Sequence, residues 1–549
     1  MEVRDTQIIL YQKNDFWISI LESEGIPFQI IKSINELQKN FNKKVLILWQ
    51  RINYDEFYHL SQWVGKENVI ITKKEQFIKF KGENRQTEKF NFSKIDFSFI
   101  ENIQEENFID YLQSSIHKGL CIGLFSDIDK YWSNTNISYK KICIDINKKI
   151  YTIESLNKIV KYNIRQYIRN VLLRSVQHFN HPLIYIWRFP KDMANVCNLR
   201  IDVDPDRNSN SIIAQKRINK TFELAKGSED RTTFMVNFYK RIDNLYFINQ
   251  YKHFSFDIQN HGYFHCLYPT FRHNLKNFDL AHMILKNNGI NPVGFTCPEY
   301  FWYNSTRKIL ENYNYIYSHS FGLDYNNYPY RPVIDGTVTN YLEIPNDPLV
   351  FSKLEHAYNK NISPEKVSEF YLKSLTDKIS TYDIPCIKYE HPAILGKYPI
   401  IIDSIYSLFN ELDNVMPVTL TQWAKWLHRR NRFINDVSIN HSCNENIESL
   451  CLNVNDNTVD LAEFGIAYQY DKDNIYVKHL EPGYKNRYDL TDFRKYTIKK
   501  SETFLNNIIF QKNEKKIDIF HSKKHLKKII SSYMLYFKYN KERFYVNQD

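Results

Sequence analysis

The chain has 549 residues, a formal net charge of +11 and 43% hydrophobic residues, so it is long enough for several globular domains. It has no apolar run of the roughly eighteen residues that span a bilayer and no signal-peptide pattern, which excludes a membrane-spanning protein and predicts a cytoplasmic one. Residues 494–549 hold 14 Lys and Arg against 5 Asp and Glu, so most of the positive charge lies in this segment. The charge of the remaining chain is nearly balanced, which argues against nucleic-acid binding.

The first predicted domain covers residues 1–165. Short β-rich runs alternate here with helical stretches such as NDFWISILESEG and INELQKNF; the runs are QIILYQ, PFQII, KVLILW and NVIIT. This rhythm predicts an open, Rossmann-like parallel sheet covered by helices. The segment carries no GxGxxG and no P-loop, so its role stays open.

A second alternation predicts a distorted β/α barrel over residues 166–430. Its strand candidates are LIYIW, NLRIDVD, TTFMVNF, FSFDIQNH, PVGFTCP, YIYSHS, YLEIP and PCIKYEHP. Barrels of this type carry their chemistry at the carboxyl ends of the strands. The residues that fall there are Asp202, Asp204, His261, Pro298 and His391.

Two further segments follow the barrel. Residues 431–490 contain β-rich runs whose residues alternate between two faces, which predicts a small β domain. This domain either packs on the barrel or binds sugar. Residues 491–549 read as a basic helical tail with apolar residues at helical spacing, namely Leu526, Ile529, Ile530, Met534 and Phe537. This pattern predicts an amphipathic helix, which either lies on the surface of an anionic membrane or packs on the protein.

A possible metal site is read from two short motifs. In QNHGYFHCLYP, His261 and His265 have the i, i+4 spacing that converges on one ion on a helix or helical turn. In NLRIDVDPD, Asp202 and Asp204 alternate at a strand end. One carboxylate and two imidazoles with open positions predict a catalytic divalent metal, most plausibly zinc. The eight cysteines form no CxxC pair, and HGYFH lacks the Glu of HExxH, which excludes a zinc ribbon and a zinc-protease helix.

With these motifs in order, residues 196–395 resemble the NodB-homology polysaccharide deacetylases, metal-dependent carbohydrate esterases that remove acetyl groups from amino sugars. The matching segments are RIDVD, HGYFH, GFTCPEYFW, YSHSFGLD and YEHP. The resemblance implies that His261, His265 and one aspartate hold the metal and that the other aspartate is the base. Following the family's order, Asp202 is assigned as base and Asp204 as ligand.

The resemblance also implies roles for residues further along the chain. His391 corresponds to the histidine that protonates the leaving amine, and a backbone N–H near Glu299, just after Pro298, corresponds to the oxyanion donor. Trp302 and Tyr303 either stack on a sugar ring or pack in the core.

The chain departs from the family at two positions. Thr296 stands where the family has an Arg that pairs with the catalytic aspartate, and Arg331 or Arg200 is a candidate replacement; Glu390 replaces an apolar residue of the acetyl pocket. The leading hypothesis is a deacetylase acting on an N-acetylated sugar of a bacterial surface polysaccharide or its precursor. The alternatives are a catalytically impaired carbohydrate-binding or scaffold protein and an amidohydrolase acting on a non-sugar amide.

Overall fold

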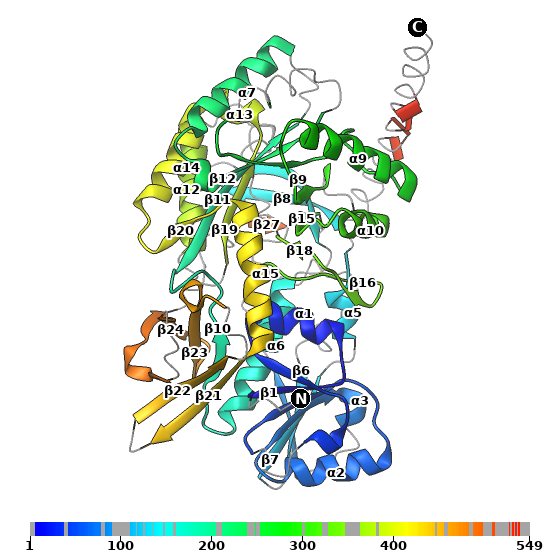
Figure 1. The fold of residues 1–549 in the computed structure, drawn as a ribbon, viewed down its shortest axis with the longest axis vertical. Helices are drawn as coiled ribbons and strands as arrows, with labels where there is room; N and C mark the ends of the chain where they lie inside the picture. The colour runs from blue at the N-terminus through cyan, green and yellow to red at the C-terminus, as the bar shows by residue number, and fades with distance from the viewer. Residues whose placement is uncertain are drawn as a thin grey trace.

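The fold was analysed in a computed structural model of the chain (Figure 1). The residues described are 6–37, 42–77, 83–89, 110–116, 118–124, 127–135, 137–145, 149–157, 161–204, 211–238, 248, 253–298, 302–320, 328–345, 363–379, 384–444, 447–454, 459–481, 487–497, 508–510 and, near the end, 526–527, 530–531, 533–534 and 536–537. None of the helices within these ranges is both long and apolar enough to cross a bilayer.

The N-terminal unit is a seven-stranded sheet in the order β2-β1-β3-β4-β7-β6-β5. Its parallel strands are β1 (Ile8–Tyr11), β2 (Phe28–Ile31), β3 (Val45–Leu48), β4 (Val69–Lys73) and β7 (Gly119–Leu124), and its antiparallel edge is β6 (Asp110–Ile116) and β5 (Glu83–Lys89). Strands such as VLIL are buried throughout because the helices α1 (Asp15–Glu24) and α2 (Tyr54–Val64) accompany the sheet. The four predicted β-rich runs form the parallel strands β1, β2, β3 and β4, and the sheet also has an antiparallel edge that was not predicted. The predicted helix in INELQKNF is only a 3₁₀ turn at Ile34–Glu36, and residues 38–41 lie outside the described ranges.

The second sheet has eight parallel strands in the order β18-β15-β14-β13-β12-β11-β19, with β20 also paired to β11. The strands are β11 (Asn195–Val203), β12 (Thr232–Val236), β13 (Asp257–Asn260), β14 (Gly294–Thr296), β15 (Tyr317–His319), β18 (Leu342–Glu343), β19 (Cys386–Glu390) and β20 (Val415–Pro417). Within the described residues β18 and β19 do not pair with each other, so the sheet is a curled half-barrel. This confirms the predicted distorted barrel, which we call the barrel sheet.

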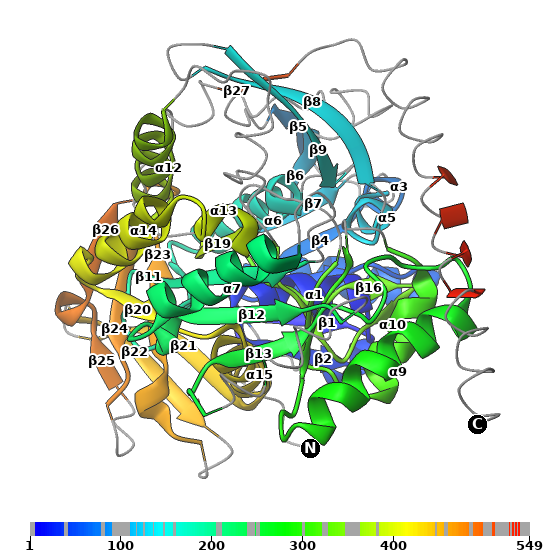
Figure 2. The same ribbon diagram turned by 90° about the horizontal axis from the view of Figure 1, so that it is seen from above.

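Helices connect consecutive strands of the barrel sheet. They are α7 (Ser211–Ala225), α9 (Phe271–Asn287), α10 (Asn304–Asn312), α12 (Pro364–Ile379), α13 (Pro392–Leu395) and α14 (Pro399–Glu411). Viewed from above, α12 and α14 lie at one end of the row of strands and α9 and α10 at the other (Figure 2). Gly289 follows α9 with a φ of 80°, a conformation that suits glycine at a helix end, and Ser363 accepts the backbone N–H of Lys366 at the start of α12.

The strand LIYIW belongs to another sheet than predicted. It forms β10 (Leu183–Ile186), which pairs antiparallel with β23 (Gly465–Gln469) in the sheet β10-β23-β24-β26. A strand that is buried on both faces has no alternation of apolar and polar residues to show which sheet it joins. For this reason LIYIW was wrongly predicted to belong to the barrel. The remaining bounds are β24 (Asn474–His479), β26 (Arg494–Thr497), β21 (Val437–Asn444), β22 (Ile447–Val454) and β25 (Arg487–Asp489).

The predicted helical tail also contains strands. Besides β26, the tail supplies β27 (Ile508–Phe510), which pairs with β8 (Ile137–Asp145), itself a partner of β9 (Lys149–Asn157). Helical turns are described only between residues 526 and 537.

Two long helices, α6 (Lys161–Gln177) and α15 (Leu420–Asp436), join the parts of the molecule (Figure 1). The buried Glu24 carboxylate of α1 lies within 3.1 Å of Arg165, Arg169 and Arg188. The buried Arg430 of α15 donates to the backbone oxygen of Glu22 in α1. Through these contacts α1 of the N-terminal unit packs against α6, α15 and the segment that follows residue 186.

Candidate metal centre

Four predicted site residues lie where neighbouring parallel strands end. Asp202 is near the end of β11 and Asp204 directly follows it, His261 follows β13, and His391 follows β19. Because β19, β11, β12 and β13 are adjacent and parallel, their carboxyl ends meet at one edge of the barrel sheet.

The Asp204 carboxylate is the centre of the cluster. Its Oδ1 lies 3.0 Å from Nε2 of His261 and 3.0 Å from Nε2 of His265, and its Oδ2 lies 3.3 Å from Nε2 of His391. Ligand atoms of Asp204, His261 and His265 all lie within 4.8 Å of one another. Asp204 Oδ1 and His265 Nε2 are both buried, and despite their 3.0 Å separation they form no hydrogen bond with each other or with any other described residue. Converging buried atoms of this kind, one carboxylate and two imidazoles, fit a divalent cation such as zinc.

The two histidines lie on a loop and not on the helical turn that their spacing suggested. Gly262 has a φ of 76°, and its N–H donates to Asn260 Oδ1 at 2.7 Å. Asn277 of α9 accepts the N–H of Phe264 at 2.6 Å. The sequence reasoning missed both asparagines, although an asparagine shortly before a glycine is a recognisable turn signal.

The ring of His261 is oriented by the backbone of Thr296. Its Nδ1 lies 2.9 Å from the Thr296 carbonyl oxygen. Because a carbonyl only accepts, Nδ1 carries the proton and Nε2 presents its lone pair to the cluster. Thr296 therefore serves the site through its main chain.

The electrostatics of the cluster follow from the partly buried carboxylate of Asp204. Burial raises the pKa of Asp204, but the charge of His265 and the ring nitrogens of His261, His265 and His391 outweigh it and hold the pKa well below its usual value. Burial lowers the pKa of His261 and His391, but the neighbouring Asp204 reverses this and raises both. The Asp202 carboxylate acts in the same direction on both rings, so its charge is close to the cluster.

Asp202 has a cationic partner on its own strand. Arg200 Nη2 lies 2.7 Å from Asp202 Oδ2, and both side chains are buried. The Arg200 guanidinium also lies over the Tyr389 ring, 4.6 Å from its centroid. Asp202 Oδ1 is buried and has no hydrogen-bond partner in the described part of the chain, so one oxygen is held and the other is available.

Arg331, the other candidate partner, lies elsewhere. Its Nη1 is 3.1 Å from Glu22 Oε1 in the N-terminal unit, and its Nε donates to the Thr339 carbonyl at 2.7 Å. Of the two arginines weighed from the sequence, the structure thus pairs Arg200 with Asp202.

The remaining predicted residues follow β14. Pro298 is buried and follows this strand after Cys297, and Glu299 lies outside the described residues. Trp302 and Tyr303 are half-buried and pack against the hydrophobic core. Burial raises the pKa of Tyr303 to about 12.

Comparisons with known proteins add the following. No family model and no curated protein matches the sequence. The solved structures that it is similar to include polysaccharide deacetylases and family 4 carbohydrate esterases. A protein from Mycobacterium smegmatis assigned as a polysaccharide deacetylase has 17% identity and a TM-score of 0.37, over 44% of this chain and 92% of that one. One from Pseudomonas aeruginosa with the same assignment has 15% identity and a TM-score of 0.34, over 43% and 92%. A family 4 pseudoenzyme from Bacillus anthracis has 12% identity and a TM-score of 0.29, over 54% and 93%.

Proposed function

We propose that the chain is a metal-dependent deacetylase that hydrolyses the acetamide of an N-acetylated sugar in a bacterial surface polysaccharide or its precursor. The observation that carries this proposal is the convergence of Asp204, His261 and His265 beside Asp202 and His391 at one edge of the barrel sheet. A carboxylate base, a histidine acid and a three-residue metal set together can catalyse the hydrolysis of an amide.

Each side chain has a distinct task in this reaction. A divalent ion held by Asp204, His261 and His265 supplies Lewis acidity for the attack on the amide carbonyl. Asp202, held by Arg200 through one oxygen, accepts a proton from the attacking water with the other. His391 donates a proton to the leaving sugar nitrogen.

The Arg200–Asp202 pair favours an enzyme over an impaired scaffold. The motive for the scaffold alternative was Thr296, because a base without a cationic partner is poorly oriented. Arg200 supplies a partner at 2.7 Å, which removes that motive.

The test is metal analysis together with acetate release. Protein purified without chelator should hold about one divalent ion per chain and release acetate from N-acetylglucosamine oligomers, and chelation should abolish the release. A bound ion without acetate release from sugar or non-sugar amides would support the impaired scaffold, whereas release from non-sugar amides alone would support the amidohydrolase. Absence of any bound ion would refute the proposal.

A further inference from the structure

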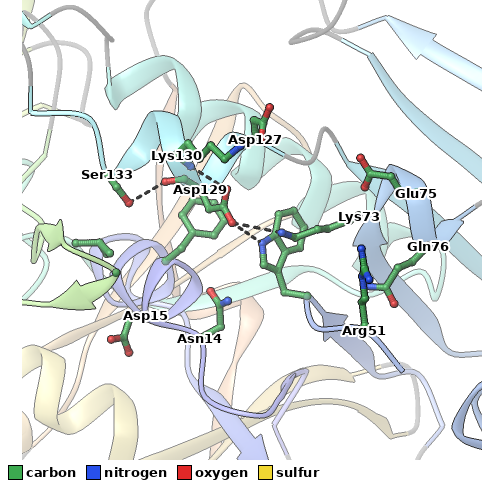
Figure 3. Close-up of a pocket in the computed structure, with 14 residues that line it drawn as sticks. Asn14, Asp15, Arg51, Lys73, Glu75, Gln76, Asp127, Asp129, Lys130 and Ser133 are labelled. Carbon is green, nitrogen blue, oxygen red and sulfur yellow. Dashed lines mark hydrogen bonds and ion pairs between the residues drawn. The ribbon is translucent and has the colours of Figure 1, made fainter. Parts of the chain in front are cut away.

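A cavity of about 700 Å³ opens at the carboxyl edge of the N-terminal sheet, within the roughly 300–1,000 Å³ typical of small-molecule sites. Its walls come from the segments that end or follow β1, β3, β4 and β7 (Figure 3). In the strand order β2-β1-β3, the chain runs from β1 to β2 on one side of β1 and then crosses to β3 on the other side. In open parallel sheets, ligands bind at the carboxyl ends of the strands where the order reverses in this way.

One side of the cavity offers carboxylates whose charge is already balanced. Asp129 Oδ2 accepts the indole N–H of Trp49 at 3.2 Å and lies 3.5 Å from Lys73 Nζ. Asp127 Oδ1 lies 2.5 Å from Lys130 Nζ. Each carboxylate has a cation and stays partly exposed, so it suits a neutral hydroxyl donor of a ligand and not a second ammonium group.

Another side offers a cation. Arg51 follows β3, is exposed, and makes no ion pair or hydrogen bond with any other residue that the structure describes. Figure 3 shows it beside Gln76, on the same side of the cavity as Lys73 and the exposed Glu75. Its planar guanidinium can hold a phosphate or carboxylate group through two parallel hydrogen bonds.

The cavity is also bordered by the barrel part of the chain. Val333 and Gly336 of the hairpin formed by β16 (Val333–Ile334) and β17 (Thr337–Val338) contribute to its wall. The backbone N–H of Val338 donates to Asp15 Oδ2 at 3.1 Å, and Asp15 Oδ1 lies 3.4 Å from Lys13 Nζ. The Asp15 carboxylate therefore has a cation near one oxygen and a backbone donor at the other.

We propose that this cavity binds a small anionic sugar, with its phosphate or carboxylate group at Arg51 and its hydroxyls at Asp127 and Asp129. The proposal is independent of the metal centre, because none of the residues lining the cavity belongs to that cluster. Sugar phosphates and sugar acids share the required chemistry, and direct binding separates them.

The test is isothermal titration calorimetry of the full-length protein, repeated after metal chelation. The probes are glucose 1-phosphate, glucuronate, glucose and inorganic phosphate. We expect one of the two anionic sugars to bind more tightly than glucose and inorganic phosphate, with and without chelator, and the tighter one identifies the anionic group.

Variants then locate the binding. Arg51→Gln should weaken binding about tenfold or more, because a charge-assisted bidentate contact is lost. The matched control is Arg432→Gln on α15, an exposed arginine that does not line the cavity, and it should bind like the natural chain.

Three results would overturn the proposal. They are no binding of either anionic sugar at millimolar concentration, equal binding by Arg51→Gln and the natural chain, and equal binding of glucose and the anionic sugars.

Asp129→Asn keeps an acceptor for the Trp49 indole, so it should fold normally while losing affinity for sugar hydroxyls. If it binds the sugars unchanged, the hydroxyl assignment fails.

Discussion

The guanidinium of Arg200 lies 2.7 Å from the carboxylate of Asp202, two residues further along the same strand. Residues i and i+2 of a strand face the same side, so the pair is a direct result of the local backbone. Arg200 thereby provides the positive charge that Thr296 does not carry. The neighbouring Tyr389 ring fixes the guanidinium from its other side.

Arg200→Met should lower kcat/KM about a hundredfold or more, because Asp202 loses the cation that orients it. Arg200→Lys keeps the charge and should recover part of the rate. Thermal unfolding measured beside the kinetics separates orientation from folding: a fall in Tm that accompanies the rate loss, with no recovery by Arg200→Lys, would show that Arg200 only supports the fold.

The two aspartates should give separate phenotypes. Asp204→Ala should lose the bound metal, because Asp204 supplies the carboxylate that both histidines face. Asp202→Asn should keep metal and fold but lose about a hundred- to ten-thousand-fold in kcat, which is the usual cost of removing a general base. Metal analysis beside steady-state kinetics measures both. Swapped phenotypes would reverse the assignment of base and ligand.

The sequence predicted which residues could form the metal site better than it predicted how these residues are arranged. His261 and His265, and the pair Asp202 and Asp204, carry motif spacings, so they were readable without coordinates, whereas the choice of Asp204 as the ligand came from the residue order of the family that the sequence resembles. The loop that holds the histidines depends on Asn260 and Asn277, whose contacts are tertiary and leave no spacing. The structure therefore adds how the ligands are held.

The error over strand β10 has a similar cause. Its partner β23 lies about 280 residues further along the chain, and a fully buried apolar strand looks the same in either sheet. The cavity in the N-terminal unit was also invisible from the sequence. It is lined by charged residues from four separate loops, whose convergence depends on the strand order alone.

A histidine pair far from the metal centre should make stability depend on pH. The rings of His181 and His441 pack edge to face with centroids 5.0 Å apart. Burial lowers the pKa of His181 from 6.5 to about 4, and His441, Lys43 and Lys44 add to the effect while Glu448 opposes it. The unfolded chain thus binds more protons between these values, so stability is full above pH 6.5 and falls as pH drops toward about 4.

Replacing the histidine should flatten this dependence. Thermal unfolding measured at about pH 8 and about pH 5 should show a smaller loss of Tm for His181→Gln than for the natural chain. His59→Gln is the matched control, because His59 is exposed on α2 and should leave the dependence unchanged. An equal loss for all three proteins would contradict the assignment.

The C-terminal helical segment presents two different surfaces. Its Tyr536 is buried against Phe264 and Tyr268, close to the loop of the metal centre. Its large apolar side chains face outward instead, with exposed fractions between 54% and 68% for Leu526, Ile530, Met534 and Phe537. Ile529 lies outside the described residues.

These four exposed residues recur at helical spacing in a segment that also carries Lys523, Lys524, Lys527 and Lys528, so we predict that the segment binds anionic lipid. Truncating the chain at residue 493 would not test this prediction, because it would also remove β26 and β27, which pair with other strands.

Replacing the four exposed residues by serine keeps those strands and the Tyr536 contact. The natural protein should float with vesicles containing phosphatidylserine and not with neutral vesicles, and the four-serine variant should stay unbound. Met283→Ser, which removes an exposed apolar side chain from α9, should float like the natural protein. Equal flotation of the four-serine variant would show that the exposed stripe does not contact lipid.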